Sequence, residues 1–232
     1  MDHKPGLLSR KWVRVLLYTA SALLLACGVF LLVREHVLLP DPDFVMPETP
    51  APTPEPTPEP TPAPGETPVP TPSPTPYVRP VPVRISFVEA KQSCEVFPGG
   101  VLENGQMEVI DRADAATWLE NVSGSLRPAP GEEGNAIIAG HKSKAGVAGT
   151  FKVLWDAKAG DAVVIDYEDG TQGWFYVDSI DRYPYQEVPA SVMSANAESP
   201  QLTLITCIGE WDSSGGTSSE RLVAVCKPGL PT

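Results

Sequence analysis

The sequence predicts a mainly β protein: a closed β-barrel of about eight strands with short helices, after an N-terminal transmembrane helix and a disordered proline-rich linker. Three observations carry this prediction. Residues 15–33 contain no charged side chain, residues 40–82 hold 18 of the 27 prolines, and the rest of the 232-residue chain consists of short apolar runs between turn residues. Many short strands in a single domain are typical of a closed barrel.

The first apolar run is long enough to span a bilayer. Its nineteen residues, 15–33, would form a helix of roughly 28 Å, close to the thickness of the hydrocarbon core. Four basic side chains precede the run, within residues 1–14. The positive-inside rule then places residues 1–14 in the cytoplasm and everything after residue 33 outside the cell. We therefore expect a single-pass protein of the cell membrane.

Two other interpretations of this run stay open. A cleaved signal peptide normally has a shorter apolar region and a polar mature start, whereas here the apolar character continues past Gly28 to Val33. Lipidation at Cys27 is the second alternative, because residues 24–27 loosely resemble a bacterial lipobox. Lipoproteins turn polar after the modified cysteine, and this chain does not. A retained anchor is the preferred prediction.

The next segment, residues 34–82, is predicted to be an extracellular Pro/Thr/Glu-rich linker. Its near-repeats of Thr-Pro and Glu-Pro favour extended polyproline II and cannot build a core. At about 3.1 Å per residue, residues 40–82 would reach on the order of 130 Å. The segment is expected to act as a spacer, with a proline-rich ligand for a partner domain as the alternative.

The remaining residues are enough for one packed domain. Between residues 83 and 227 there are 21 Asp and Glu against 11 Lys and Arg. Nucleic acid is therefore excluded as a partner, because binding phosphates requires a basic face.

Short apolar runs and turn residues define the expected elements of this domain. Several runs are rich in β-branched residues and lie between Gly, Asp, Asn or Pro. Asp169-Gly170 has the composition of a hairpin turn. Helices are expected only at 113–121 and 150–155. The predicted strands are 83–88, 135–139, 162–167, 173–177, 201–206 and 222–226.

Three side chains form a candidate catalytic set. Cys207 ends the apolar segment 203–207, Arg221 lies 14 positions later, and His141 is the one histidine after the linker. If the strands before and after the loop 210–220 pair in antiparallel fashion, Cys207 and Arg221 face each other at one end of a hairpin. Such a set can supply a nucleophile, a proton carrier and an oxyanion partner.

Two features of the set stay unresolved in the sequence. Arg182 is a second candidate arginine, although its surroundings, Asp181-Arg182-Tyr183-Pro184, fit a loop over a groove better. No acidic or amide side chain follows His141 closely, so the group that would orient its imidazole is not identified.

These motifs resemble those of the sortases, the cysteine transpeptidases of Gram-positive-type surfaces. The resemblance rests on Ala139-Gly140-His141, on Thr203-Leu204-Ile205-Thr206-Cys207 and on an arginine before an apolar terminal strand. It covers about residues 82–227, so residues 83–232 would be the catalytic domain. An anchor and an extended linker before that domain also match the family. The few residues before the histidine segment look most similar to class F or class E.

The resemblance implies a two-step acyl transfer. Cys207 would attack the threonine carbonyl of an LPXTG-type sorting signal and form a thioester, and His141 would move the protons. Arg221 would stabilise the oxyanion or hold the substrate backbone. The acceptor would be an amine of a peptidoglycan precursor or of a pilin. No metal and no cofactor is required by this scheme.

The resemblance also implies a groove for the sorting signal. Thr206 is a candidate substrate-binding residue beside the nucleophile. Val188 and Pro189, on the segment that follows Arg182, are candidates for an apolar pocket that takes the Leu and Pro of the signal.

The exported part of the chain has three cysteines, Cys94, Cys207 and Cys226. If Cys207 stays free, Cys94 and Cys226 are the only possible disulfide pair, and an oxidising exterior would suit such a bond. Two separate buried thiols are the equal alternative.

Two other function classes remain to be compared. An L,D-transpeptidase also uses Cys and His outside the membrane, but that family carries an arginine two residues after its cysteine, where this chain has Gly209. A non-enzymatic β adhesion module would show no dependence on Cys207. We prefer the sortase interpretation.

Overall fold

The computed structural model describes residues 40–49, 77–214 and 216–230. The predicted anchor at 15–33 and much of the predicted linker lie outside these ranges. Within the ranges, none of the helices has both the length and the apolar character needed to cross a bilayer.

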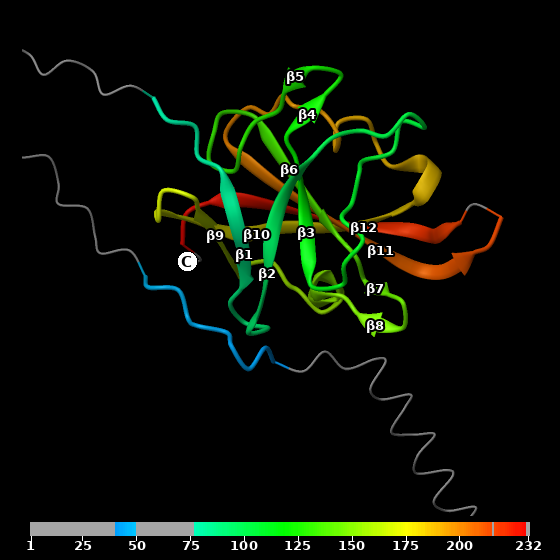
Figure 1. Cartoon of the computed structure of the whole chain (residues 1–232), viewed down its shortest axis with the longest axis horizontal. Coiled ribbons are helices and arrows are strands. Elements are labelled where there is room, and N and C mark those ends of the chain that lie inside the picture. The colour runs from blue at the N-terminus through cyan, green and yellow to red at the C-terminus, as the bar shows by residue number, and fades with distance from the viewer. Residues whose placement is uncertain (1–39, 50–76, 215, 231–232) are drawn as a thin grey trace, which may run out of the picture.

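Eight strands close into a barrel in the order β1-β2-β3-β6-β11-β12-β10-β9 (Figure 1). Their bounds are β1 Pro82–Phe87, β2 Gln92–Gly99, β3 Ala115–Leu119, β6 Asn135–Gly140, β9 Ala162–Tyr167, β10 Gln172–Pro184, β11 Gln201–Asp212 and β12 Thr217–Pro228. Closure leaves no free sheet edge around the barrel. The predicted mainly β fold with about eight strands is confirmed.

Smaller elements occupy the connections between these strands. Two short hairpins are β4 Asn121–Val122 with β5 Ser125–Leu126, and β7 Ser143–Lys144 with β8 Val147–Ala148. The helical elements are 3-10 turns, η1 Thr150–Trp155 and η2 Tyr185–Glu187. The helix expected at 150–155 is thus present as a 3-10 turn.

The core lies inside the barrel and is completed by η1. Trp118 of β3 is 0% exposed and Phe151 of η1 is 1% exposed. Phe151 meets Phe87 of β1 edge to face, with ring centroids 5.4 Å apart. Such aromatic pairs contribute about 0.5–1.5 kcal/mol beyond the area that they bury. Helix η1 is therefore fixed against the barrel by its apolar side chains.

The helix expected at 113–121 is wrong, because residues 115–119 form strand β3. All five residues of this strand are buried, and it pairs in parallel with β2 and in antiparallel with β6. A central strand buried on both faces gives a continuous apolar run, so it lacks the alternation that marks a half-buried strand. Strand β2 was not predicted either.

The hairpin expected at Asp169-Gly170 is confirmed between β9 and β10. The Asp169 carboxylate accepts hydrogen bonds from the backbone N–H of Thr171 at 2.9 Å and from its hydroxyl at 2.6 Å. Gly170 has φ +82°, a conformation that glycine adopts without steric cost. The sequence therefore identified the turn by its chemistry.

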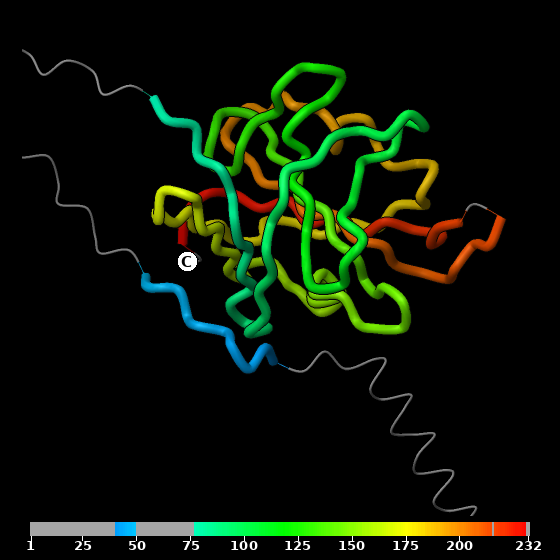
Figure 2. Tube along the Cα trace, viewed as in Figure 1, coloured from blue at the N-terminus to red at the C-terminus, as the bar shows by residue number. Residues whose placement is uncertain are grey.

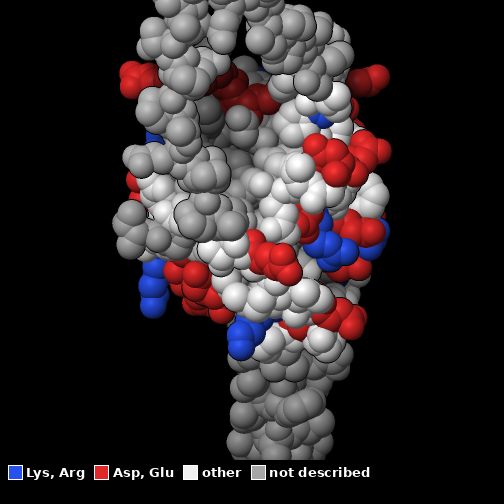
Figure 3. Space-filling model, turned by 90° about the vertical axis from the view of Figure 1, so that its left-hand side faces the viewer, with Lys and Arg blue, Asp and Glu red and all other residues white. Residues whose placement is uncertain are grey.

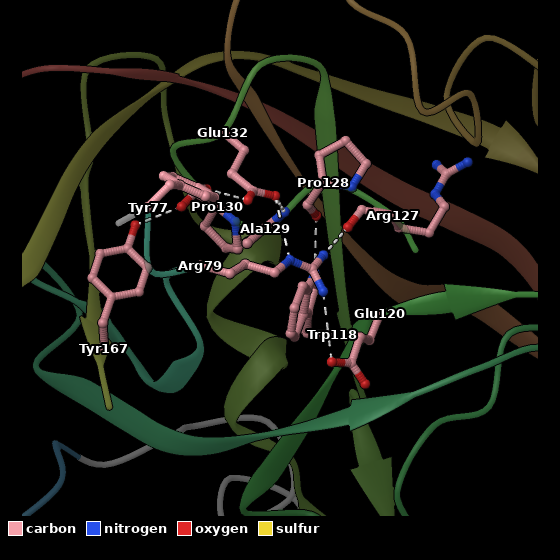
Figure 4. A network of polar contacts seen from close by, with 10 residues as sticks. All are labelled: Tyr77, Arg79, Trp118, Glu120, Arg127, Pro128, Ala129, Pro130, Glu132 and Tyr167. Carbon is pink, nitrogen blue, oxygen red and sulfur yellow. Dashed lines mark hydrogen bonds and ion pairs between the residues drawn. The ribbon is translucent and has the colours of Figure 1, made fainter. Parts of the chain in front are cut away.

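The chain enters the barrel through a polar network around Arg79 (Figure 4). The Arg79 guanidinium lies 4.7 Å from the centroid of the Trp118 ring and forms ion pairs with Glu120 at 3.7 Å and Glu132 at 3.5 Å. The Tyr77 hydroxyl donates to the same Glu132 carboxylate. Contacts with the domain thus begin before residue 83.

Residues 40–49 also contact the domain, beside the turn between β1 and β2 (Figure 2). The backbone N–H of Asp41 donates to the carbonyl of Lys91 at 2.9 Å. The Ser93 hydroxyl donates to the Asp41 carboxylate at 3.2 Å. The described parts on both sides of residues 50–76 therefore touch the barrel.

Carboxylates are spread over the face of the protein drawn in Figure 3, with fewer Lys and Arg side chains among them. Basic side chains of the described ranges are also paired with carboxylates: Arg112 lies 3.0 Å from Asp114 and 3.2 Å from Glu95. The face drawn in Figure 3 thus agrees with the acidic composition.

Candidate active site

Parallel pairing of β6 and β11 brings His141 and Cys207 to one edge of the barrel. The pairs run from Gln201 with Asn135 to Ile205 with Ala139, a constant offset of 66 residues. Cys207 and His141 differ by the same 66 positions, so each lies two residues beyond the last register pair of the two strands. Because the paired segments run in parallel, the residues that follow them lie on the same side of the barrel.

Antiparallel pairing of β11 and β12 adds Arg221 to this edge. Cys207 and Arg221 are register partners, which confirms the hairpin geometry expected from the sequence. The connecting loop is shorter than the predicted 210–220, because β11 continues to Asp212 and β12 begins at Thr217. The resulting two-stranded hairpin projects beyond the barrel (Figure 1).

Thr206 joins the end of β6 to the middle of β11. Its side chain is 2% exposed, and its hydroxyl donates to the carbonyl of Gly140 at 2.9 Å. Gly140 and Thr206 immediately precede His141 and Cys207, so this bond fixes the end of β6 relative to the part of β11 that carries Cys207. The predicted substrate contact of Thr206 stays a prediction.

The imidazole of His141 is half-buried and held from one side. Its Nε2 is buried without a hydrogen-bond partner among the described residues, while the ring bonds to the backbone of Ile110. Burial lowers the pKa of His141 most, and the nearby Lys144 ammonium lowers it further; the Ile110 bond and the Asp111 carboxylate act in the opposite direction. The neutral imidazole is therefore favoured at pH 7.

The group that orients His141 was missed from the sequence because it lies on a distant loop. The Ile110 backbone N–H donates to the Thr117 hydroxyl at 2.8 Å, and Thr117 is 2% exposed in the middle of β3. The Asp111 carboxylate forms an ion pair with Lys144. The one local sign of this contact in the sequence is Thr117, a polar residue inside the otherwise apolar run 115–119.

Opposite pKa shifts are expected from the two halves of the Asp111–Lys144 pair. Lys144→Gln removes the ammonium, so the remaining Asp111 carboxylate should raise the pKa of His141. Asp111→Asn removes the carboxylate, so the remaining Lys144 ammonium should lower that pKa. NMR titration of the imidazole, assigned with His141→Asn, measures both shifts. Shifts of the same sign in the two variants would contradict the assignment of these neighbours.

The lowered pKa also fixes the sign of a stability change. The unfolded chain binds a proton at His141 near pH 6.5, whereas the folded chain binds it only at lower pH. As the pH falls from above 6.5 to below the folded-state pKa of His141, the unfolded state binds more protons than the folded state. The free energy of unfolding therefore decreases because of His141. In His141→Asn this part of the loss should be absent from denaturant titrations repeated across the same window.

Arg221 is fixed as a cation beside Cys207. Its Nη1 donates to the carbonyls of Ser218 and Glu220, both at 3.0 Å, and its Nη2 donates to the Thr217 hydroxyl at 2.8 Å. The guanidinium stacks on Tyr185, 4.8 Å from the ring centroid. These bonds hold the charge in place before any substrate arrives, which is what electrostatic stabilisation of an oxyanion requires.

The alternative arginine, Arg182, was expected on a loop, and this is wrong. It lies in β10 opposite Leu222, and its Nη2 forms a 2.7 Å ion pair with Glu220. Val188 and Pro189 are half-buried and follow η2, the turn that begins with Tyr185. They therefore share a short segment with the ring that stacks on Arg221.

All three cysteines of the described ranges are free thiols. Burial raises the pKa of Cys94 and of Cys226 to about 12, whereas Cys207 is partly exposed. The structure therefore contains two buried thiols rather than a Cys94–Cys226 disulfide. Within the same ranges, no cluster of three or more His, Cys, Asp or Glu side chains is arranged to hold a metal ion.

A cysteine, a histidine and a fixed arginine at one barrel edge are the groups that a cysteine acyl transferase uses. The model of the sortase domain family matches residues 96–229, more than half of the chain. The chain belongs to the sortase family. No curated protein sequence matches it.

Solved sortase structures are similar to this chain. Sortase A from Corynebacterium diphtheriae is 23% identical over 66% of this chain and 62% of its own, with a TM-score of 0.46. The lid mutant of Streptococcus agalactiae sortase C1 is 18% identical over 64% of this chain and 69% of its own, with a TM-score of 0.45. Listeria monocytogenes sortase A is 21% identical over 64% and 88%, with a TM-score of 0.45.

Proposed function

We propose that this sortase is a membrane-anchored cysteine transpeptidase that cleaves an LPXTG-type sorting signal between Thr and Gly and transfers the protein to an amine of the cell wall or of a pilin. One observation carries the proposal. The registers of β6, β11 and β12 bring His141, Cys207 and Arg221 to the same edge. Membership of the sortase family supports the reaction class.

In the first step neutral His141 takes the proton of the Cys207 thiol, and the resulting thiolate attacks the threonine carbonyl. The new C–S bond gives a tetrahedral oxyanion, which the fixed Arg221 cation stabilises. The C–N bond to glycine then breaks, and protonated His141 gives its proton to the leaving amine. The products are a thioester on Cys207, a free glycine amine and a neutral imidazole.

In the second step the acceptor amine attacks the thioester. Neutral His141 takes a proton from the attacking nitrogen, and the C–S bond breaks to release the Cys207 thiolate. The lowered pKa of His141 favours the form of the imidazole that accepts this proton. Return of the proton from His141 to the Cys207 sulfur restores the starting state, with no metal or cofactor in either step.

The substrate groove and the setting of the domain are further parts of this proposal. Thr206 would meet the signal beside the nucleophile, and Val188 with Pro189 would take its Leu and Pro. Residues 15–33 would anchor the chain with residues 1–14 in the cytoplasm, and the catalytic domain would face the exterior. Assignment to class F or class E stays a prediction.

Mass spectrometry of the acyl-enzyme tests the reaction. Residues 40–232 are incubated with an LPXTG peptide, with and without a glycine amine. We expect a covalent adduct on Cys207 that disappears when the amine is added, and no adduct in Cys207→Ala. The absence of an adduct in the wild type, or turnover that persists in Cys207→Ala, would overturn the assignment. A panel of sorting motifs in the same assay ranks the substrates.

A further inference from the structure

Strand β11 loses a neighbour where the chemistry is proposed to occur. Strand β6 ends at Gly140, and its last register pair with β11 is Ala139 with Ile205. From Cys207 onward β11 pairs only with β12. A strand edge without a partner exposes backbone carbonyls that must be satisfied in another way.

Two side chains satisfy these carbonyls in place of a strand. The Trp155 indole N–H donates to the Cys207 carbonyl at 3.2 Å. The Lys142 ammonium donates to the Gly209 carbonyl at 2.9 Å, a charge-assisted bond of the stronger kind. The Lys142 Nζ also lies 5.7 Å from the Trp155 ring centroid, so the two donors stabilise each other.

The backbone at this point needs support because it is irregular. The register of β11 and β12 shifts between Ile208 and Trp211, and Gly209 has φ +79°. A Cβ at Gly209 would come within 2.8 Å of a Glu220 carboxylate oxygen. The positive φ and these close side-chain neighbours favour glycine at this irregularity, and the two donors bond to the opposite edge of the strand.

We propose that Trp155 and Lys142 are positioning residues. Their bonds to the carbonyls of Cys207 and Gly209 fix the position of this backbone segment relative to His141. Lys142 directly follows His141 in the chain, so its bond to Gly209 ties the part of β11 that carries Cys207 to the segment that carries His141. Trp155, the last residue of η1, holds the nucleophile's own carbonyl. The inference rests on the proposed role of Cys207, and misplacing a reacting group by 1 Å can cost about 100-fold in rate.

Matched variants of the full-length chain in detergent test the proposal. Trp155→Phe keeps a ring without the N–H, and Lys142→Met keeps the length of the stem without the charge. Each is expected to lower the acylation rate at saturating LPXTG peptide by roughly tenfold, with little change in the peptide concentration at half-maximal rate. The controls are Trp174→Phe, whose indole N–H has no hydrogen-bond partner in the described ranges, and exposed Lys158→Met.

A second measurement does not depend on the reaction. Amide hydrogen exchange of residues 205–210 should be roughly fivefold faster in Trp155→Phe and Lys142→Met than in the wild type and both controls. Unchanged exchange in both variants, or wild-type acylation rates in both, overturns the positioning role. If the wild type forms no acyl-enzyme but exchange is still faster in both variants, Trp155 and Lys142 do hold the backbone of residues 207–209, and it is the proposed function that fails.

Discussion

Replacing His141 by asparagine is expected to lower the rate of acyl-enzyme formation by about 10²- to 10⁴-fold, the usual contribution of a general acid or base. Asparagine retains an amide N–H that can bond to the Ile110 backbone, as the imidazole does, but it does not titrate. The buried Nε2 has no partner in the described part of the chain, so its removal breaks no hydrogen bond there. Intact-mass kinetics with an LPXTG peptide measure the rate.

The control for this variant is His36→Asn, the same change at a position in the predicted linker. Its acylation rate should equal that of the wild type. The thermal midpoints of both variants are measured beside their rates, to separate lost chemistry from lost folding. An acylation rate within a factor of three of the wild type in His141→Asn would exclude this imidazole as the proton carrier, since far larger losses are typical.

Gly149→Ala is expected to damage both folding and catalysis. Gly149 precedes η1, and its N–H donates to the Lys142 carbonyl at 2.9 Å. A Cβ at this position would overlap the His141 carbonyl oxygen and lie 2.7 Å from its carbonyl carbon. Backbone atoms must move to admit it, at a cost of about 1–3 kcal/mol. Because the displaced segment carries His141, the acylation rate should fall as well.

Urea denaturation and acylation kinetics on one preparation of Gly149→Ala measure the two effects. Gly100→Ala is the control. A Cβ at Gly100 would lie 3.4 Å from its nearest neighbour, the Asn121 carbonyl oxygen, which is an ordinary contact distance. That variant should keep wild-type stability and rate. Wild-type behaviour of Gly149→Ala would mean that the segment from His141 to η1 can shift without affecting the site.

Local chemistry was sufficient to predict several elements of the fold. The run 162–167 coincides with β9, because a short apolar run rich in β-branched residues is followed there by a turn with Asp and Gly. The spacing of Cys207 and Arg221 predicted their pairing, because an antiparallel hairpin converts sequence distance directly into register. These predictions depend on contacts between neighbours in the chain.

Contacts between distant segments account for the errors and the gaps. Residues 115–119 look helical alone and become a strand because β2 and β6 flank them. Ile110 reaches His141 from a loop before β3, and Trp155 reaches Cys207 across 52 positions. Neither contact leaves a local pattern, since backbone carbonyls are partners that every residue type can offer.

The two buried thiols affect how the protein responds to oxidants and alkylating reagents. Thiolate is the form that reacts, and Cys94 and Cys226, with pKa values of about 12 and almost no exposed surface, supply almost none of it near neutral pH. Neither sulfur can compete with Cys207 for an electrophile or form a mixed disulfide while the barrel stays closed. Among the described cysteines, covalent modification of the folded domain therefore reports on one sulfur, and modification of the other two reports that the barrel has opened.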